Sequence, residues 1–183
     1  MKSYSEFIDR IFRAEHLLEK LTPSEPLDRE LLRQIREADE ATIGGGRKIA
    51  AAKTFALIRG GLLYAVDSLD PAHAIFQEAP GDLGSYWHGM MHRREGDFDN
   101  ARYWFRRAGA LPFFAALHRV ASEVSPDMAR QLTWDPYLFT GQCEQTHHGA
   151  EELTSEMAKL QRIEFDAIFD YCWRQGVASE GGK

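Results

Sequence analysis

Apolar residues at helical spacing, interrupted mainly by proline and glycine, limit most strongly how this chain can fold. Phe7, Ile8, Ile11 and Phe12 begin a series that returns every three or four positions, as on one face of a helix. No stretch alternates apolar and polar residues convincingly enough to indicate a strand. The sequence therefore predicts an all-α fold, a helical bundle or array whose short connections favour antiparallel neighbours.

Capping signals predict where the helices begin and end. Ser3-x-x-Glu6 has the spacing of a capping box, and Thr22-Pro23 ends the first helix. Asp70-Pro71, Ser125-Pro126 and Asp135-Pro136 each place a capping side chain before a proline at the first helical position. Gly44-Gly45-Gly46 is interpreted as a hinge. The predicted helices cover about 3–21, 28–40, 47–68, 71–79, 84–95, 98–109, 112–123, 126–132, 136–145 and 149–175.

Composition excludes several classes of protein. A chain of 183 residues with 44% hydrophobic and 27% charged residues suits one all-α domain, 1–183, with N-terminal helices in 1–40. A net charge of −6 disfavours nucleic acid as a partner, and no apolar run approaches the length of a membrane span. The N-terminus has no apolar region typical of a secretory signal. Two cysteines form no disulfide framework, so we expect a soluble, cytoplasmic protein.

One predicted hairpin has the residue spacing of a helical repeat. Gly89 lies 12 positions before Ala101, and Phe105 follows Ala101 by four. Small residues let two helices approach closely while the aromatic ring fills the space beside them. The pattern resembles one tetratricopeptide (TPR) unit, and Gly60, Ala72 and Phe76 repeat its offsets 29 residues earlier. One alternative function is therefore a TPR-like protein-interaction module, in which a groove formed by the hairpins receives a peptide.

Two histidines on one helical face suggest a metal site. His88 and His92 are four residues apart, and Glu95 continues their stripe. Two imidazoles and a carboxylate can hold a divalent metal ion, although Gly89 stands where a His-Glu-x-x-His motif has its glutamate. His147-His148 could lend a third ligand. Two alternatives stay open: a structural role in hydrogen bonds, and a small-molecule site in which the histidines bind ligand or act as a general base.

Charged and aromatic residues on the neighbouring segments favour an anionic ligand. Residues 86–107 contain five arginines and three acids, whereas 123–170 contain ten acids and three basic residues. These two regions can pair within the fold, or the basic centre can bind an anion bidentately. Asn100, Tyr103, Trp104 and Arg107 form a stripe that Arg93 can approach.

Glu164 falls on an apolar stripe of the predicted last helix. If that carboxylate is buried, it needs a charged partner such as a histidine or an arginine. A small rotation of the helix would instead leave Glu164 at the rim. The sequence does not separate these two alternatives.

These patterns define one candidate site. We expect a polar pocket that binds a small, anionic ligand or a divalent metal, and a metal-dependent hydrolase using His88 and His92 is a further alternative. No cofactor and no reaction follow from the sequence. Metal ligation is assigned to His88 and His92, and the candidate ligand-binding residues are His88, His92, Arg93, Glu95, Asp97, Asn100, Tyr103, Arg107 and Glu164.

A longer resemblance covers about residues 47–175. Tyr86-Trp87-His88 followed by the segment His-Arg-Arg-Glu-Gly-Asp-Phe at 92–98, and Trp134-Asp135-Pro136 later in the chain, resemble an uncharacterised family of bacterial all-α proteins. The resemblance implies a shared helical core over 47–175 and a shared polar centre. It implies no activity, substrate or cofactor.

Overall fold

The protein is built from α-helices. The computed structural model describes residues 4–147 and 154–177, and in these ranges the backbone forms no strand beyond an isolated bridge between Ile49 and Val177. The predicted all-α class is confirmed. None of the helices within these ranges is both long enough and apolar enough to cross a membrane. The helices are α1 (Glu6–Phe12), α2 (Arg29–Glu37), α3 (Glu40–Gly44), α4 (Ala52–Ala65), α5 (Leu69–Phe76), α6 (Gly81–Glu95), α7 (Phe98–Ala108), α8 (Phe114–Ala121), α9 (Pro126–Ala129), α10 (Pro136–His147) and α11 (Thr154–Gly176).

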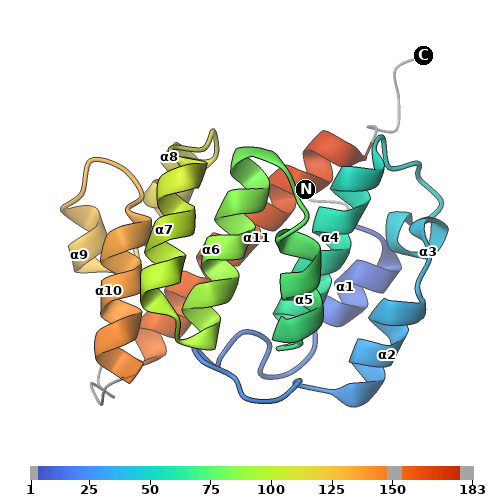
Figure 1. Ribbon diagram of the computed structural model, residues 1–183, viewed down its shortest axis with the longest axis horizontal. Coiled ribbons are helices and arrows are strands. Elements are labelled where there is room, and N and C mark those ends of the chain that lie inside the picture. The colour runs from blue at the N-terminus through green and yellow to red at the C-terminus, as the bar shows by residue number, and fades with distance from the viewer. Residues whose placement is uncertain (1–3, 148–153, 178–183) are drawn as a thin grey trace.

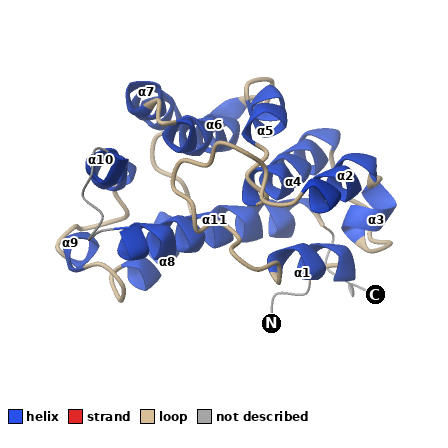
Figure 2. Ribbon diagram, turned by 90° about the horizontal axis from the view of Figure 1, so that it is seen from below, coloured by secondary structure: helices blue, strands red, loops and turns tan. Residues whose placement is uncertain are grey.

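Helix α6 lies in the middle of the fold. Figure 1 shows α5, α6 and α7 side by side, with the long helix α11 running behind them. Viewed from below, α11 and α8 form a second layer beneath α6 and α7 (Figure 2). Every residue from 84 to 94 is buried, including two arginines and two histidines. Polar side chains on α6 therefore need partners from the surrounding helices.

Several predicted caps are confirmed at the atomic level. The Ser125 hydroxyl accepts from the Met128 N–H, with Pro126 at the first helical position of α9. Asp135 accepts from the backbone N–H groups of Tyr137 and Leu138. The Asp70-Pro71 prediction is wrong, because α5 already begins at Leu69 and its N-cap makes no side-chain hydrogen bond.

The N-terminal segment differs from the single helix predicted for 3–21. Helix α1 is capped by Ser5, whose hydroxyl accepts from the Ile8 N–H, and it ends at Phe12; Ser3 lies outside the described residues. His16 and Leu18 adopt left-handed backbone conformations, with φ of 60° and 63°. Leu18 is nevertheless buried. Its apolar side chain reaches the core from a turn. The apolar spacing in this segment therefore reflects burial of the side chains and not a continuous helix.

The long helix predicted for 47–68 is shorter. Helix α4 begins at Ala52 because the preceding residues pair with the end of α11, where the Ala50 N–H donates to the Gly176 carbonyl at 2.7 Å. A Cβ at Gly176 would lie 2.2 Å from the Thr54 methyl group, so this junction depends on the absence of a side chain.

Both glycine–phenylalanine hairpins pack as their spacing predicts. Phe105 is buried against Gly89, where a Cβ would lie 2.8 Å from its ring. Phe76 is buried against Gly60, where a Cβ would lie 2.6 Å from its ring. The pairs α4–α5 and α6–α7 thus use the same close contact between a glycine and an aromatic ring.

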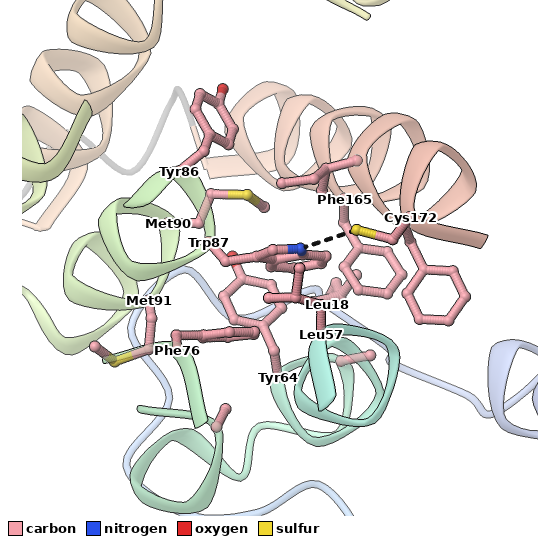
Figure 3. Packing of buried hydrophobic residues seen from close by; sticks show 14 of the residues in the cluster. Leu18, Leu57, Tyr64, Phe76, Tyr86, Trp87, Met90, Met91, Phe165 and Cys172 are labelled. Carbon is pink, nitrogen blue, oxygen red and sulfur yellow. Dashed lines mark hydrogen bonds between the residues drawn. The ribbon is translucent and has the colours of Figure 1, made fainter. Parts of the chain in front are cut away.

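Trp87 anchors the aromatic core between these hairpins and α11. Its indole stacks on Phe76 with ring centroids 5.1 Å apart and meets Phe165 edge-on. Figure 3 shows the indole nitrogen of Trp87 directed at Cys172 on α11, with 3.3 Å between Nε1 and Sγ. Trp87 is fully buried, in agreement with a core role.

Candidate metal centre

Three histidines from two helices meet at one point on the side of α6. One ring nitrogen from each of His73, His88 and His92 lies within 4.8 Å of the other two. His73 comes from α5, and its Nε2 is 3.0 Å from Nε2 of His88. The rings of His88 and His92 stack with centroids 4.6 Å apart, as the spacing of four residues dictates.

The Glu95 carboxylate lies between two of the histidines, His73 and His92, and contacts both. Its Oε1 lies 3.2 Å from Nδ1 of His73, and its Oε2 lies 3.2 Å from Nδ1 of His92. Although partial burial acts in the opposite direction, contacts with His92 and His73 hold the pKa of the Glu95 carboxyl below its usual range. A carboxylate behind a histidine fixes the tautomer and the ring orientation, and this favours a free lone pair on the opposite nitrogen.

Helix α7 covers the cluster with an aromatic ring and an amide. Trp104 stacks on His88 with ring centroids 4.0 Å apart. The side-chain nitrogen of Asn100 lies 3.2 Å from Nε2 of His92, where it can donate a hydrogen bond to an unprotonated ring nitrogen. Trp104 is half-buried and covers His88 on its outer side.

Burial keeps the inner histidine neutral. His88 is 3% exposed and its Nδ1 has no hydrogen-bond partner within the described part of the chain. Burial, followed by the neighbouring His92 and His73, lowers the pKa of His88 to about 4. At neutral pH His88 is therefore an uncharged imidazole, the form in which histidine binds a metal ion. The side chains of His73 and Glu95 are 28% and 25% exposed, so solvent reaches the cluster from their side.

Arg93 lies on a different face of α6 from the histidines and meets Glu164 of α11. It follows His88 by five positions, which turns its side chain about 140° away from that histidine. The Arg93 guanidinium and the Glu164 carboxylate form a fully buried ion pair. Tyr86 donates to Glu164 at 2.7 Å and accepts from the Trp134 indole at 2.6 Å. The structure thus buries Glu164 with an arginine partner, but joins neither residue of the pair to the histidine cluster.

Arg94 forms a second buried ion pair that the sequence analysis missed. Its guanidinium donates to the backbone carbonyls of Tyr64 and Lys20 and pairs with Asp67. Asp67 has a left-handed backbone with φ of 60°, and burial raises the pKa of its carboxyl. These contacts tie α6 to the segment after α4 and to the N-terminal segment. No spacing rule signals such a partner set, because its members are far apart in sequence.

The remaining predicted site residues lie around the cluster without joining it. Asp97 caps α7 by accepting from the Asn100 N–H, and its carboxylate is 3.9 Å from Nδ1 of His92. Tyr103 is exposed, and Arg107 lies over the rings of Tyr103 and Trp104. His147 is 3.3 Å from the Thr22 hydroxyl and is not part of the three-histidine cluster, while His148 lies outside the described residues.

His73 is the member of the cluster that was not among the site residues predicted from the sequence. It precedes His88 by 15 residues and lies on another helix, so no local periodicity connects the two. The repeated hairpin spacing was the one sequence signal for this contact. It makes α5 and α6 neighbouring helices of two consecutive hairpins, and their packing brings one face of each helix together.

Comparison with protein-family models, with curated proteins and with solved structures finds no match. The geometry of the histidine cluster therefore carries the functional argument.

Proposed function

We propose that this protein binds a divalent transition metal ion through His73, His88 and His92. The observation that carries this proposal is the convergence of three ring nitrogens within 4.8 Å of one another. Metal–nitrogen bonds of about 2.0–2.1 Å place two ligand nitrogens about 3–3.4 Å apart on a tetrahedral or octahedral ion. The 3.0 Å between the Nε2 atoms of His73 and His88 already meets this requirement, and small ring rotations can bring in His92.

The position of Glu95 next to His73 and His92 supports the metal-binding hypothesis. A carboxylate that accepts from the Nδ1–H of a histidine leaves Nε2 as the ligand atom and makes it more basic. Glu95 does this for His73. The Nδ1 of His92 lies 3.2 Å from Glu95 Oε2 without making a hydrogen bond to it, and its Nε2 faces Asn100. Imidazole ligands suit zinc, copper, nickel or iron better than calcium or magnesium.

The competing interpretation is a metal-free histidine cluster that joins α5 to α6. In that case His73 and His88 share one proton between their Nε2 atoms, and the contact contributes only the strength of a neutral hydrogen bond. The two interpretations differ in what a chelator does to the protein. Removing a bound ion costs stability in proportion to its affinity and concentration, whereas a hydrogen-bonded cluster is indifferent to chelation.

Zinc titration against a chromophoric chelator tests the proposal, with His73→Gln as the main variant. His73 is partly exposed, so its replacement should leave the helical circular-dichroism spectrum unchanged. We expect one zinc ion per chain in the parent protein and at least about tenfold weaker binding in His73→Gln. His16→Ala is the control, because His16 is exposed, pairs with Glu19 and is not part of the three-histidine cluster. Equal zinc affinity in all three proteins would refute metal binding at the cluster.

A metal-dependent hydrolase, the further alternative drawn from the sequence, would use such an ion. His73, His88 and His92 would hold the ion, and a zinc ion with three histidine ligands would supply an activated water for hydrolysis. The solvent-facing side of the cluster at His73 and Glu95 favours access of a small substrate. Cleavage of 4-nitrophenyl acetate that requires zinc and is lost in His73→Gln would support this use.

A TPR-like protein-interaction module is the second candidate function. The repeated glycine–phenylalanine contact in the hairpins α4–α5 and α6–α7 supports it. In that case the histidines are structural, and His73→Gln should bind peptides as the parent protein does.

A reducing, cytoplasmic location fits both candidates, because Cys143 and Cys172 are free thiols.

A further inference from the structure

Asn100 brings a polar group from α7 to the three-histidine cluster. Its side-chain nitrogen, Nδ2, lies 3.2 Å from Nε2 of His92. Its backbone N–H donates to the carboxylate of Asp97, the residue that caps α7, so Asn100 is fixed in the first turn of that helix. The side chain is half-buried. Asn100 therefore meets the His92 ring on the side that faces α7.

The surroundings of His92 determine which ring nitrogen carries the proton when the ring is neutral. His92 is 5% exposed, and its Nδ1 has no hydrogen-bond partner within the described part of the chain. Oε2 of Glu95 nevertheless lies 3.2 Å from Nδ1. A lone pair on Nδ1 would oppose the lone pairs of that carboxylate, whereas an N–H presents the opposite partial charge. The proton therefore sits on Nδ1, and Nε2 keeps the lone pair that accepts from the Asn100 amide.

This lone pair is the one that a metal ion requires. An imidazole binds a metal ion through the ring nitrogen that carries no proton. The Nε2 atoms of His73 and His88 face each other at 3.0 Å, whereas Nε2 of His92 faces an amide donor. The amide and an ion cannot both occupy one lone pair. The third histidine is therefore blocked until the Asn100 side chain moves.

Packing limits that movement to the side chain. A Cβ at Gly89 on α6 would lie 3.2 Å from the Ala101 carbonyl oxygen and 2.8 Å from the Phe105 ring. Ala101 and Phe105 are both buried, so the backbone next to Asn100 is held against α6. The half-buried side chain of Asn100 can turn about its own bonds to another rotamer. Release of His92 thus requires the rotation of one side chain and no shift of α7.

We infer that Asn100 gates the histidine centre: its amide holds Nε2 of His92 in the metal-free protein, and an ion gains His92 as its third ligand only when the amide turns away. The inference rests on the proposed metal binding and adds the regulation of that site. Asn100 is a positioning residue that lowers the affinity of the centre. A metal that binds imidazole strongly displaces the amide, whereas one that prefers oxygen ligands does not.

Zinc affinity in Asn100→Ala tests the gate, with the same competition against a chromophoric chelator. The variant removes the amide that competes for Nε2, and the net strength of one hydrogen bond predicts about three- to tenfold tighter zinc binding. Gln145→Ala is the matched control. It also removes an amide from a helix without changing the net charge, and Gln145 is an exposed residue of α10. We expect the control to bind zinc as the parent protein does. Unchanged or weaker binding in Asn100→Ala would overturn the inference.

Nitrogen-15 NMR of the histidine-labelled parent chain tests the gate without any variant. Long-range proton–nitrogen spectra distinguish ring nitrogens that carry a proton, a lone pair or a metal ion. In the metal-free chain we expect the proton of His92 on Nδ1 and a lone pair on Nε2. Added zinc should bind His92 through Nε2. A proton on Nε2 in the metal-free chain, or zinc on Nδ1, would contradict the gate.

The outcomes separate the gate from the proposed function. A parent chain that takes up no zinc refutes the metal centre, and the gate is refuted with it. Zinc binding that depends on His73, with equal affinity in the parent chain and in Asn100→Ala, supports the metal centre and refutes only the gate.

Discussion

His73 and His88 come from different helices, and their Nε2 atoms lie 3.0 Å apart. Two neutral imidazoles can share one proton at this distance, or both can direct a lone pair at an ion. His88 is the buried member and His73 the partly exposed one, so any ion held between them is accessible from one side. This contact joins α5 to α6, so the candidate metal centre lies where the two hairpins α4–α5 and α6–α7 meet.

Phe105→Ala should destabilise the protein by about 3–5 kcal/mol, the cost of emptying a well-packed aromatic site. Phe105 is buried between Gly89 and Tyr86, with the Tyr86 ring centroid 5.0 Å away. Urea denaturation followed by circular dichroism measures the change. A loss below about 1 kcal/mol would show that this ring is not part of the core.

Two glycine-to-alanine replacements should change stability in opposite directions. A Cβ at Gly89 would lie 2.8 Å from the Phe105 ring, so Gly89→Ala forces two packed helices apart and should cost about 1–3 kcal/mol. Gly141 is also helical, but a Cβ there would meet nothing within 4 Å. Gly141→Ala should therefore stabilise the protein by about 0.5–1 kcal/mol through helix propensity. Thermal melts of both variants check this, and two changes of the same sign would contradict it.

Glu164→Gln should destabilise the fold without affecting zinc affinity. The change leaves the buried Arg93 guanidinium without a counter-charge, and a cost of about 3 kcal/mol is expected. Glu144→Gln is the control, because Glu144 pairs with Arg102 in a partly exposed bridge worth about 1 kcal/mol or less. Chemical denaturation gives both values. If Glu164→Gln instead abolishes zinc binding while stability is retained, the ion pair belongs to the site.

Both thiols should be unreactive in the native protein. Burial raises the pKa of Cys143 and of Cys172 to about 12 in each case. The reactive thiolate is therefore a small fraction of each cysteine at pH 8, and access is blocked as well. A chromogenic disulfide reagent should react slowly with the folded chain and titrate two thiols after unfolding in guanidinium. Rapid reaction of the folded chain would contradict the buried placement.

Local sequence signals were sufficient for much of the fold. Ser125-Pro126 and Asp135 act as caps where predicted, because a cap involves only residues within three positions of one another. The hairpin offsets were informative for a similar reason, since Gly89 and Phe105 belong to adjacent helices. The prediction failed for the segment after Phe12, where Leu18 is buried from a left-handed turn. Apolar spacing reports burial, and burial does not require a helix.

The site could be predicted only in part. His88, His92 and Glu95 share one face of one helix, so their spacing was visible in the sequence. Their partner His73 depends on how α5 packs beside α6, which is a tertiary property. The same limit explains Arg93, which was grouped with the histidines by proximity in sequence although it points about 140° away from His88 around the helix.

X-ray absorption at the zinc edge tests the central claim most directly. The spectrum of the zinc-loaded chain should show a first shell of nitrogen and oxygen at about 2.0–2.1 Å, with the multiple scattering of three imidazoles. His73→Gln should reduce the imidazole count from three to two. Zinc bound with sulfur at about 2.3 Å, or with no imidazole scattering, would contradict a metal centre built from His73, His88 and His92.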